Sequence, residues 1–311
     1  MIHVTKVKVR TMSKHVVWTQ WEDLVVPEGF VALNPQSRPL DSSDLSDITF
    51  FTPFYMSGRA GLEPSKRMPN LKILQVPNAG YDDAIEYVRE GVVLCNARGV
   101  HDASTSELAI GLAIAVRRGF SDFARAQVQG KWEHRRYASL TDSKIAIIGY
   151  GSIGQRVAQG LSGFEVSIDA YSRSGNHGSM KIDQLDENLH KYDVVILTLP
   201  LTDESRKMFN AERLSLMKSG SALINVARGG VVDTQALLAE LNSGRLWAGL
   251  DVTDPEPLPE GHPLWEAKNC IIVPHVGGDS NAFLGRGKRL VEEQLGRLSR
   301  DEEIINIVAK G

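Results

Sequence analysis

Apolar residues fall into short runs separated by polar or helix-like segments, and this alternation continues through most of the chain. In the first hundred residues, four of these runs have the length and composition of strands. They are residues 16–18, 48–51, 71–76 and 92–94. Polar or helical segments, such as Tyr81 to Glu90, lie between some of them. Strands separated by helices predict an open α/β sheet.

A more regular alternation of strand and helix begins at Lys144. Its strands are continuously apolar, which predicts a parallel, doubly wound sheet covered on both faces. The predicted strands are residues 144–148, 166–171, 194–199, 222–226, 247–252 and 270–273, with helices at 153–161 and 234–243. A long helix-like tail follows Gly278, and we expect it to lie outside this sheet and to return to the first domain.

Residues 107–118 are apolar on nearly every side, which predicts a buried helix. The preceding Ser104–Ser106 offers an N-cap, and Arg117, Arg118 and Gly119 supply a basic last turn and a stop. Packing between domains or subunits is the role expected for this helix.

Composition narrows the class of protein. With 311 residues the chain exceeds what one hydrophobic core usually supports, so two domains are expected. A net charge of -3 gives no basic surface for nucleic acid or an anionic membrane, and no apolar run approaches the about 18 residues of a membrane span.

Residues 1–11 lack the apolar stretch of a signal peptide, which predicts a cytoplasmic protein, and Met12 offers a second start. Cys95 and Cys270 lie far apart in apolar runs, which predicts two buried thiols and no metal site.

A glycine-rich segment, GYGSIG at residues 149–154, joins a predicted strand to a predicted helix. In that context it is typical of a dinucleotide site. Gly149 permits the tight turn, Gly151 lets the backbone approach a pyrophosphate, and Gly154 allows close packing of helix and strand. Ser152 and Ile153 open the helix, whose free N–H groups can meet the phosphate charge.

The end of the next predicted strand bears on the choice of cofactor. An NAD site normally has an acid there for the ribose 2′-hydroxyl, whereas this chain has Ser172, Arg173 and Ser174. Hydroxyls and a guanidinium suit a 2′-phosphate, so NADP(H) is favoured over NAD(H). The alternative is that Asp169 takes the ribose role, although the alternation of a strand turns Asp169 to the opposite face from Ala170.

Five segments, in their order and spacing, closely resemble the D-2-hydroxyacid dehydrogenase family. They are NAGYD at 78–82, TLPLT at 198–202, INVARGGVVD at 224–233, GLDVTDPEPLP at 249–259 and VPHVGG at 273–278. The resemblance runs from about residue 70 to the C-terminus. With the strand pattern, it implies a Rossmann-type nucleotide domain at 102–278 inserted in a flavodoxin-like substrate domain at 1–101 plus 279–311.

The resemblance also implies a catalytic set of Arg228, Glu256 and His275, and chemistry agrees with it. Arg228 follows a strand, where its planar fork can hold a carboxylate and polarise a neighbouring ketone. His275 can act as acid or base near neutral pH, and Glu256 can fix its tautomer and raise its pKa. Asp254 is the rival acid.

Other site residues follow from the resemblance. Backbone N–H groups of Asn78, Ala79 and Gly80 would bind the substrate carboxylate, and Asp251 would hold the nicotinamide carboxamide. The remaining cofactor contacts implied are Leu199, Pro200, Val226, Ala227, Arg228, His275, Gly277 and Gly278. The family is usually homodimeric through the nucleotide domain, with residues 107–118 and 132–137 as the expected contact surfaces.

These observations predict an NAD(P)-dependent reductase of small 2-keto acids such as glyoxylate or hydroxypyruvate. One alternative is D-3-phosphoglycerate dehydrogenase, which needs further positive charge from residues such as Arg59, Arg98, Arg135 or Arg136. Another is a non-catalytic nucleotide sensor similar to the family's corepressor relatives. Formate-type chemistry is less favoured, because no matching special motif is present.

Overall fold

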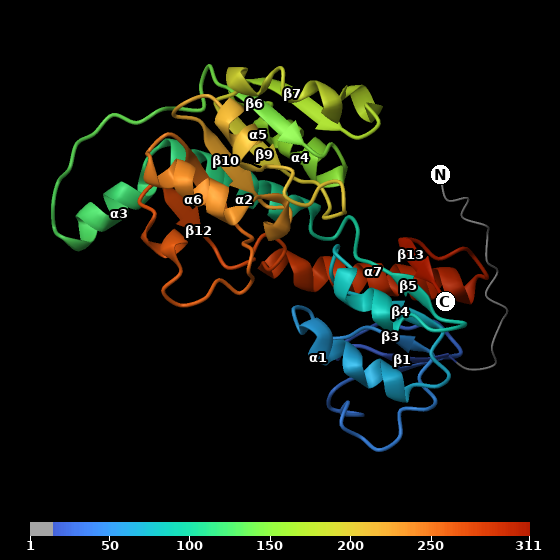
Figure 1. Cartoon of the computed structure of the whole chain (residues 1–311). Coiled ribbons are helices and arrows are strands. Elements are labelled where there is room, and N and C mark those ends of the chain that lie inside the picture. Colours follow the sequence, from blue (N-terminus) through green and yellow to red (C-terminus); the bar gives the residue numbers. More distant parts are fainter. Residues whose placement is uncertain (1–14) are drawn as a thin grey trace. The chain divides into compact units, whose positions relative to one another are not determined.

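The computed structural model describes residues 15–311, and the alternative start at Met12 lies outside them. The chain forms two compact units (Figure 1). Unit 1 contains the described residues up to His101 together with Asn281–Gly311, and unit 2 is Asp102–Ser280. Among the described residues, no helix combines the length and the apolar character needed to cross a membrane.

Unit 1 is built on a sheet with the order β13-β5-β4-β3-β1-β2. Its strands are β1 (His15–Trp18), β2 (Phe30–Leu33), β3 (Phe50–Phe51), β4 (Ile73–Gln75), β5 (Val93–Cys95) and β13 (Ile307–Lys310). All neighbours are parallel except β13, which runs antiparallel to β5. The five parallel strands have the 2-1-3-4-5 order of flavodoxin-like sheets. The two edge strands, β2 and β13, were not predicted; each is paired on one side only, and most of its residues are partly exposed.

The helices of unit 1 are α1 (Gly58–Leu62) and α7 (Asn281–Ser299). Phe283, Leu290, Val291 and Leu295 of α7 pack into the same core as Val17, Phe50 and Ile73 of the sheet. The predicted tail therefore returns to unit 1. The segment at 81–90, predicted to be polar or helical, contains a 3₁₀ helix at Asp82–Tyr87.

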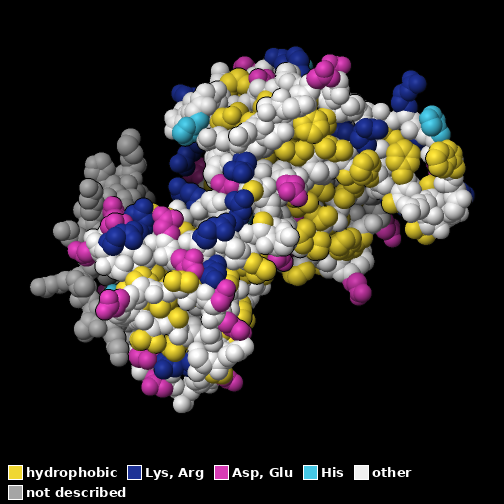
Figure 2. All heavy atoms as spheres, turned by 180° about the vertical axis from the view of Figure 1, so that it is seen from behind, with side chains coloured by type: hydrophobic (Ala, Val, Ile, Leu, Met, Phe, Trp, Pro, Cys, Tyr) yellow, Lys and Arg dark blue, Asp and Glu magenta, His cyan; other side chains and the backbone are white. Residues whose placement is uncertain are grey.

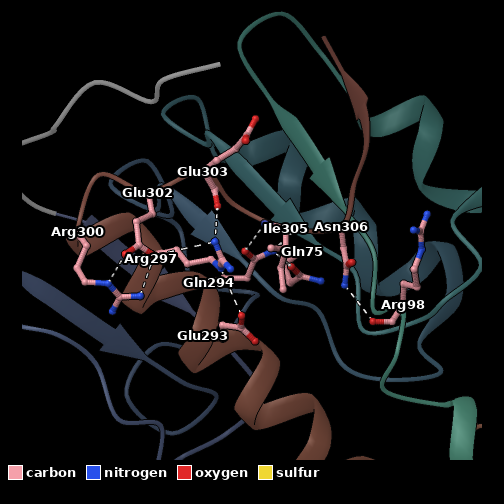
Figure 3. A network of polar contacts seen from close by, with 10 residues as sticks. All are labelled: Gln75, Arg98, Glu293, Gln294, Arg297, Arg300, Glu302, Glu303, Ile305 and Asn306. Atoms are coloured by element: carbon pink, nitrogen blue, oxygen red, sulfur yellow. Dashed lines mark hydrogen bonds and ion pairs between the residues drawn. The ribbon is translucent and has the colours of Figure 1, made fainter. Parts of the chain in front are cut away.

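A buried amide network joins the end of α7 to this sheet (Figure 3). Gln294 is 0% exposed; its Nε2 donates to Gln75 Oε1 at 2.9 Å and to Ile305 O at 2.8 Å. Its Oε1 accepts the Ile305 N–H, and Gln75 Nε2 donates onward to Asn96 O. Leaving one such buried group without a partner costs about 1–3 kcal/mol, so these bonds specify where α7 docks.

Unit 2 has a fully parallel sheet with the order β12-β11-β10-β9-β6-β7-β8. The strands are β6 (Lys144–Ile148), β7 (Ser167–Ser172), β8 (Met180–Lys181), β9 (Val194–Leu197), β10 (Ala222–Asn225), β11 (Trp247–Leu250) and β12 (Cys270–Ile272). The chain runs outward from β6 to β7 and β8, then crosses back to β9. Because the carboxyl ends of β6 and β9 flank this reversal, a ligand site is expected between them.

The helices of unit 2 are α2 (Asp102–Arg117), α3 (Phe120–Val128), α4 (Ser152–Leu161), α5 (Ala211–Leu216) and α6 (Thr234–Asn242). Ala109, Leu112, Ala113 and Val116 of α2 are buried in the core with residues of β6, β9 and β10. The predicted helix at 107–118 exists, but the expected cap was wrong. Ser104–Ser106 lies inside the first turns, because the helix already begins at Asp102.

Cys95 and Cys270 are both buried and free, as predicted. Burial raises the pKa of each thiol to about 12, so both remain protonated and behave as small apolar side chains.

Candidate active site

The glycine loop lies between the carboxyl ends of β6 and β9. Gly149 has φ +98°, and a Cβ there would lie 2.7 Å from the backbone nitrogen of Leu199. A Cβ on Gly154 would lie 2.2 Å from Gly149 O. Neither position can carry a side chain, so the turn packs directly on the end of β9. At Gly151 a Cβ would meet nothing within 4 Å, which leaves the start of α4 open to an anion.

Thr198 secures this turn from the β9 side, because its Oγ1 donates to Gly149 O at 2.6 Å. Sequence reasoning gave Thr198 no role of its own. A hydroxyl directly after a buried strand was the only available signal.

A cavity of about 400 Å³ opens beside the glycine loop. Its walls come from the loop, the end of β7 and the segment after β9. They include Gly149, Gly151, Ser172, Arg173, Ser174, Leu199, Pro200 and Glu204. The structure thus brings together the predicted pyrophosphate and ribose residues from three parts of the chain.

The carboxylate of Asp169 is bonded to a tyrosine outside the cavity. Tyr192 Oη donates to Asp169 Oδ2 at 2.8 Å, and the hydroxyls of Tyr192 and Tyr171 are 2.6 Å apart. Asp169 is not among the residues that line the cavity. Arg173 lines it, as does Glu204, whose pKa is lowered first by a hydrogen bond from Thr202 and also by the charge of Arg173.

Arg228 is positioned by the turn that follows β10. The buried Asn225 spans this turn: its Oδ1 accepts the Ala227 N–H at 3.0 Å and its Nδ2 donates to Arg228 O at 3.0 Å. Arg228 Nη1 also donates to Ala227 O at 2.7 Å. Val226 and Ala227 are buried. Asn225 was missed as a site residue, although an asparagine ending an apolar strand is a signal for a turn.

The loop after β10 meets the loop after β11 without room for a side chain. A Cβ on Gly229 would lie 1.8 Å from Thr253 O. This close approach places Arg228 in the same neighbourhood as Glu256, which follows β11 in sequence. The charge of Arg228 acts on the pKa of both Glu256 and His275.

His275 and Glu256 form a direct pair, with 2.5 Å between Nδ1 and Oε1. The hydrogen bond to Glu256 raises the pKa of His275 above its ordinary value; burial and the charge of Arg228 oppose the rise. Burial works to raise the pKa of Glu256, but the bond and charge of His275 lower it overall. Asp254, the rival acid, is exposed, and its backbone O accepts from Thr234. The partner of His275 is therefore Glu256.

Asp251 holds the backbone around His275. It is 2% exposed; its Oδ1 accepts the Val276 N–H at 2.7 Å and its Oδ2 the Gly277 N–H at 3.0 Å. The His275 N–H donates to Asp251 O at 2.8 Å. Burial raises the pKa of the Asp251 carboxyl, against these bonds. A role for Asp251 towards a nicotinamide carboxamide stays a prediction.

In unit 1, the loop of Asn78, Ala79 and Gly80 follows β4. Its carbonyls are engaged: Asn78 O accepts the Ala97 N–H at 2.9 Å, and Ala79 O accepts Asn96 Nδ2 at 2.6 Å. Within the part of the chain that the structure describes, the N–H groups of residues 78–80 have no acceptor. Such a row of free amides can bind an anion.

The family is shown by comparison with known proteins. Residues 110–277, more than half of the chain, match the model described as "D-isomer specific 2-hydroxyacid dehydrogenase, NAD binding domain". The chain belongs to the D-isomer specific 2-hydroxyacid dehydrogenase family. It is accordingly an NAD(P)-dependent oxidoreductase that acts on CH–OH groups.

Two similar members of the family are a glyoxylate reductase and a hydroxypyruvate reductase. The glyoxylate reductase of Thermofilum pendens is 35% identical over 72% of this chain and 70% of its own length. The hydroxypyruvate reductase of Thermotoga maritima is 32% identical over 72% of this chain and 76% of its own length. A family structure from Xanthobacter autotrophicus Py2, in complex with NADPH and MES, is 25% identical with a TM-score of 0.76, over 96% of this chain and 98% of that one.

The His275–Glu256 pair leads to a first prediction. Replacing Glu256 with Gln removes the carboxylate that stabilises the imidazolium, while burial and the charge of Arg228 remain. The pKa of His275, followed by NMR titration of its ring protons, should then fall below its value in the unaltered protein. Glu260→Gln, at an exposed acid of the same loop, should leave it unchanged. An unaltered His275 pKa in Glu256→Gln would contradict the pairing.

Proposed function

We propose that this chain reduces a small 2-keto acid, such as glyoxylate or hydroxypyruvate, to the D-2-hydroxyacid with NADPH. The observation that carries the proposal is the His275–Glu256 pair, which lies with Arg228 past the carboxyl ends of strands in the same parallel sheet that carries the glycine loop. The glyoxylate reductase and hydroxypyruvate reductase among its relatives support the substrate class.

With NADPH bound, the dihydronicotinamide would supply the hydride for C2 of the keto acid. His275 is the proton donor: because Nδ1 faces Glu256, the proton for the substrate oxygen is held at Nε2. The hydrogen bond to Glu256 raises the pKa of His275, which favours the protonated ring. In unit 2, Arg228 can hold a carboxylate and polarise a neighbouring ketone, and in unit 1 the free amides of Asn78, Ala79 and Gly80 can bind a carboxylate.

A second prediction tests His275. His275→Ala should lower the turnover of glyoxylate or hydroxypyruvate by about 10²–10⁴-fold, since a positioned acid contributes that much. The affinity for NADPH, measured by fluorescence titration, should change little. His190→Ala, at an exposed histidine of the same unit, serves as the control. Full turnover in His275→Ala would remove it as the acid.

A panel of 2-keto acids, run with NADPH and NADH in parallel, belongs to the same experiment. Turnover of 3-phosphohydroxypyruvate above the small acids would favour the phosphoglycerate alternative. The structure speaks against it at two of the available cations, because Arg59 is ion-paired with Glu86 and Arg135 with Glu133. Tight NADPH binding without turnover of any acid would instead indicate a sensor.

The preference for NADPH is supported by Ser172, Arg173 and Ser174 in the cavity wall and by the engagement of Asp169 with Tyr192. A third prediction follows. Arg173→Ala should raise the KM for NADPH by about tenfold or more, the worth of a charge-assisted phosphate contact, and leave the KM for NADH nearly constant.

Two variants complete this test. Glu204→Gln removes the acid beside Arg173 and should lower the KM for NADPH. Lys191→Ala, at an exposed cation of the same unit, should change neither KM. Equal losses with both cofactors in Arg173→Ala would contradict the proposed preference.

We also infer a homodimer formed through unit 2. The segment after α3 runs outward from the rest of the unit (Figure 1), and apolar side chains there and at the end of α3 meet solvent: Trp132 is 98% and Val128 90% exposed. The same unit shows a broad apolar area from behind (Figure 2). Large apolar side chains exposed together mark interaction sites in soluble proteins.

A fourth prediction concerns this assembly. Light scattering should give a mass of twice 34.2 kDa for the unaltered protein, and Trp132→Asp should shift it towards one chain. Val25→Asp, at an apolar residue of unit 1 that is also well exposed, should keep the larger mass. A single-chain mass for the unaltered protein would refute the dimer.

A further inference from the structure

His101 lies beneath the loop that carries the free amides. It is the last residue of unit 1 before the chain passes into unit 2. Its side chain is 4% exposed, and its Nε2 lies 2.7 Å from Pro77 O. A carbonyl oxygen can only accept, so Nε2 carries the hydrogen of this bond.

The bond completes a pattern along the loop. Three successive carbonyls, of Pro77, Asn78 and Ala79, accept hydrogen bonds from one segment, residues 96–101. The donors are the His101 ring, the Ala97 N–H and the Asn96 amide. Each peptide unit has its C=O and N–H on opposite sides, so holding the carbonyls fixes the direction of the following N–H groups. The amides of Asn78, Ala79 and Gly80 are those N–H groups.

The His101 ring is itself held by stacking. Its centroid lies 5.2 Å from that of Tyr55, with planes 16° apart, and 5.6 Å from that of Phe283, with planes 8° apart. Tyr55 and Phe283 stack at 4.0 Å. Phe283 lies two residues after Asn281, where the chain re-enters unit 1. The orientation of the Nε2–H group is therefore set by packing at the two places where the chain crosses between the units.

We propose that His101 is a positioning residue, whose Nε2–H bond to Pro77 O aligns the amides of residues 78–80 to receive the substrate carboxylate. The proposal rests on the function proposed above and adds to it a residue that touches neither substrate nor cofactor. Loop amides that bind the carboxylate equally in the ground and transition states affect KM and leave kcat nearly constant.

The variants separate the hydrogen bond from the ring. His101→Phe keeps a stacking ring without a donor. His101→Gln and His101→Met have side chains of similar length, and only Gln can donate to Pro77 O. The Gln/Met pair decides the question even where the loss of the ring lowers stability in both, or where His101→Phe fails to fold. Tyr87→Phe is the matched control, because it removes a hydroxyl of the same unit whose partners, Arg59 O and Glu63, lie outside the loop.

Two measurements on the full-length variants test the proposal. With saturating NADPH, the KM for glyoxylate should rise about five- to thirtyfold in His101→Phe and His101→Met, the usual effect of losing a buried hydrogen bond, with kcat nearly constant. His101→Gln should recover most of the loss, and Tyr87→Phe should show none. Without substrate, amide hydrogen exchange in a peptide covering residues 77–81 should be faster in the Phe and Met variants than in the Gln variant.

The outcomes discriminate clearly. Equal KM values and equal exchange in the Gln and Met variants would overturn the proposal and leave His101 a packing residue. A fall in kcat at constant KM would also overturn it. If the unaltered protein reduces no keto acid, the proposed function fails, while the exchange comparison still decides whether His101 positions the loop.

Discussion

The buried carboxylate of Asp251 is the constraint on which the arrangement in unit 2 depends. Its side chain and its carbonyl together bind the amides of three successive residues, His275, Val276 and Gly277. His275 is thereby held at φ +54°, a left-handed conformation that costs on the order of 1–3 kcal/mol for a residue other than glycine. The fit is tight, because a Cβ on Gly277 would lie 2.7 Å from Asp251 Oδ2. The histidine that carries the proposed proton is therefore placed by the bonds that backbone amides of residues 275–277 make to Asp251, the residue that follows the adjacent strand.

The charges around His275 act in opposite directions. Glu256 stabilises the imidazolium, whereas Arg228 lowers the pKa of His275. A carboxylate bound at Arg228 would neutralise that second influence, since an ion pair cancels much of the field of each partner. In the proposed reaction, the substrate would thus favour the protonated form of the acid that serves it. The same groups that recognise the keto acid would also prepare the proton donor.

The sequence could predict features that depend on residues close together in the chain, but not those that depend on contacts between distant segments. The run at 144–148 matches β6, a central strand whose last four residues are buried, whereas the edge strands β2 and β13 were not predicted and keep most of their residues partly exposed. Motif residues such as His275 could be named in advance, but not the left-handed backbone that Asp251 imposes on it. Asn225 had a local signal, since its partner Arg228 is three residues away, whereas the proposed role of His101 had none. Its partner, the carbonyl of Pro77, is 24 residues away and comes close only in the fold.

The division of unit 1 between two distant stretches of chain has a consequence for biosynthesis. Unit 2 is one continuous stretch and can fold as soon as it has been made. The sheet of residues 15–101 must wait for α7 to cover its apolar face and for β13 to pair with β5. At typical rates of translation the intervening residues take roughly 10 to 40 s to make. During that interval β5 presents an open strand edge, so the nascent chain is most exposed to aggregation after its first third has been translated.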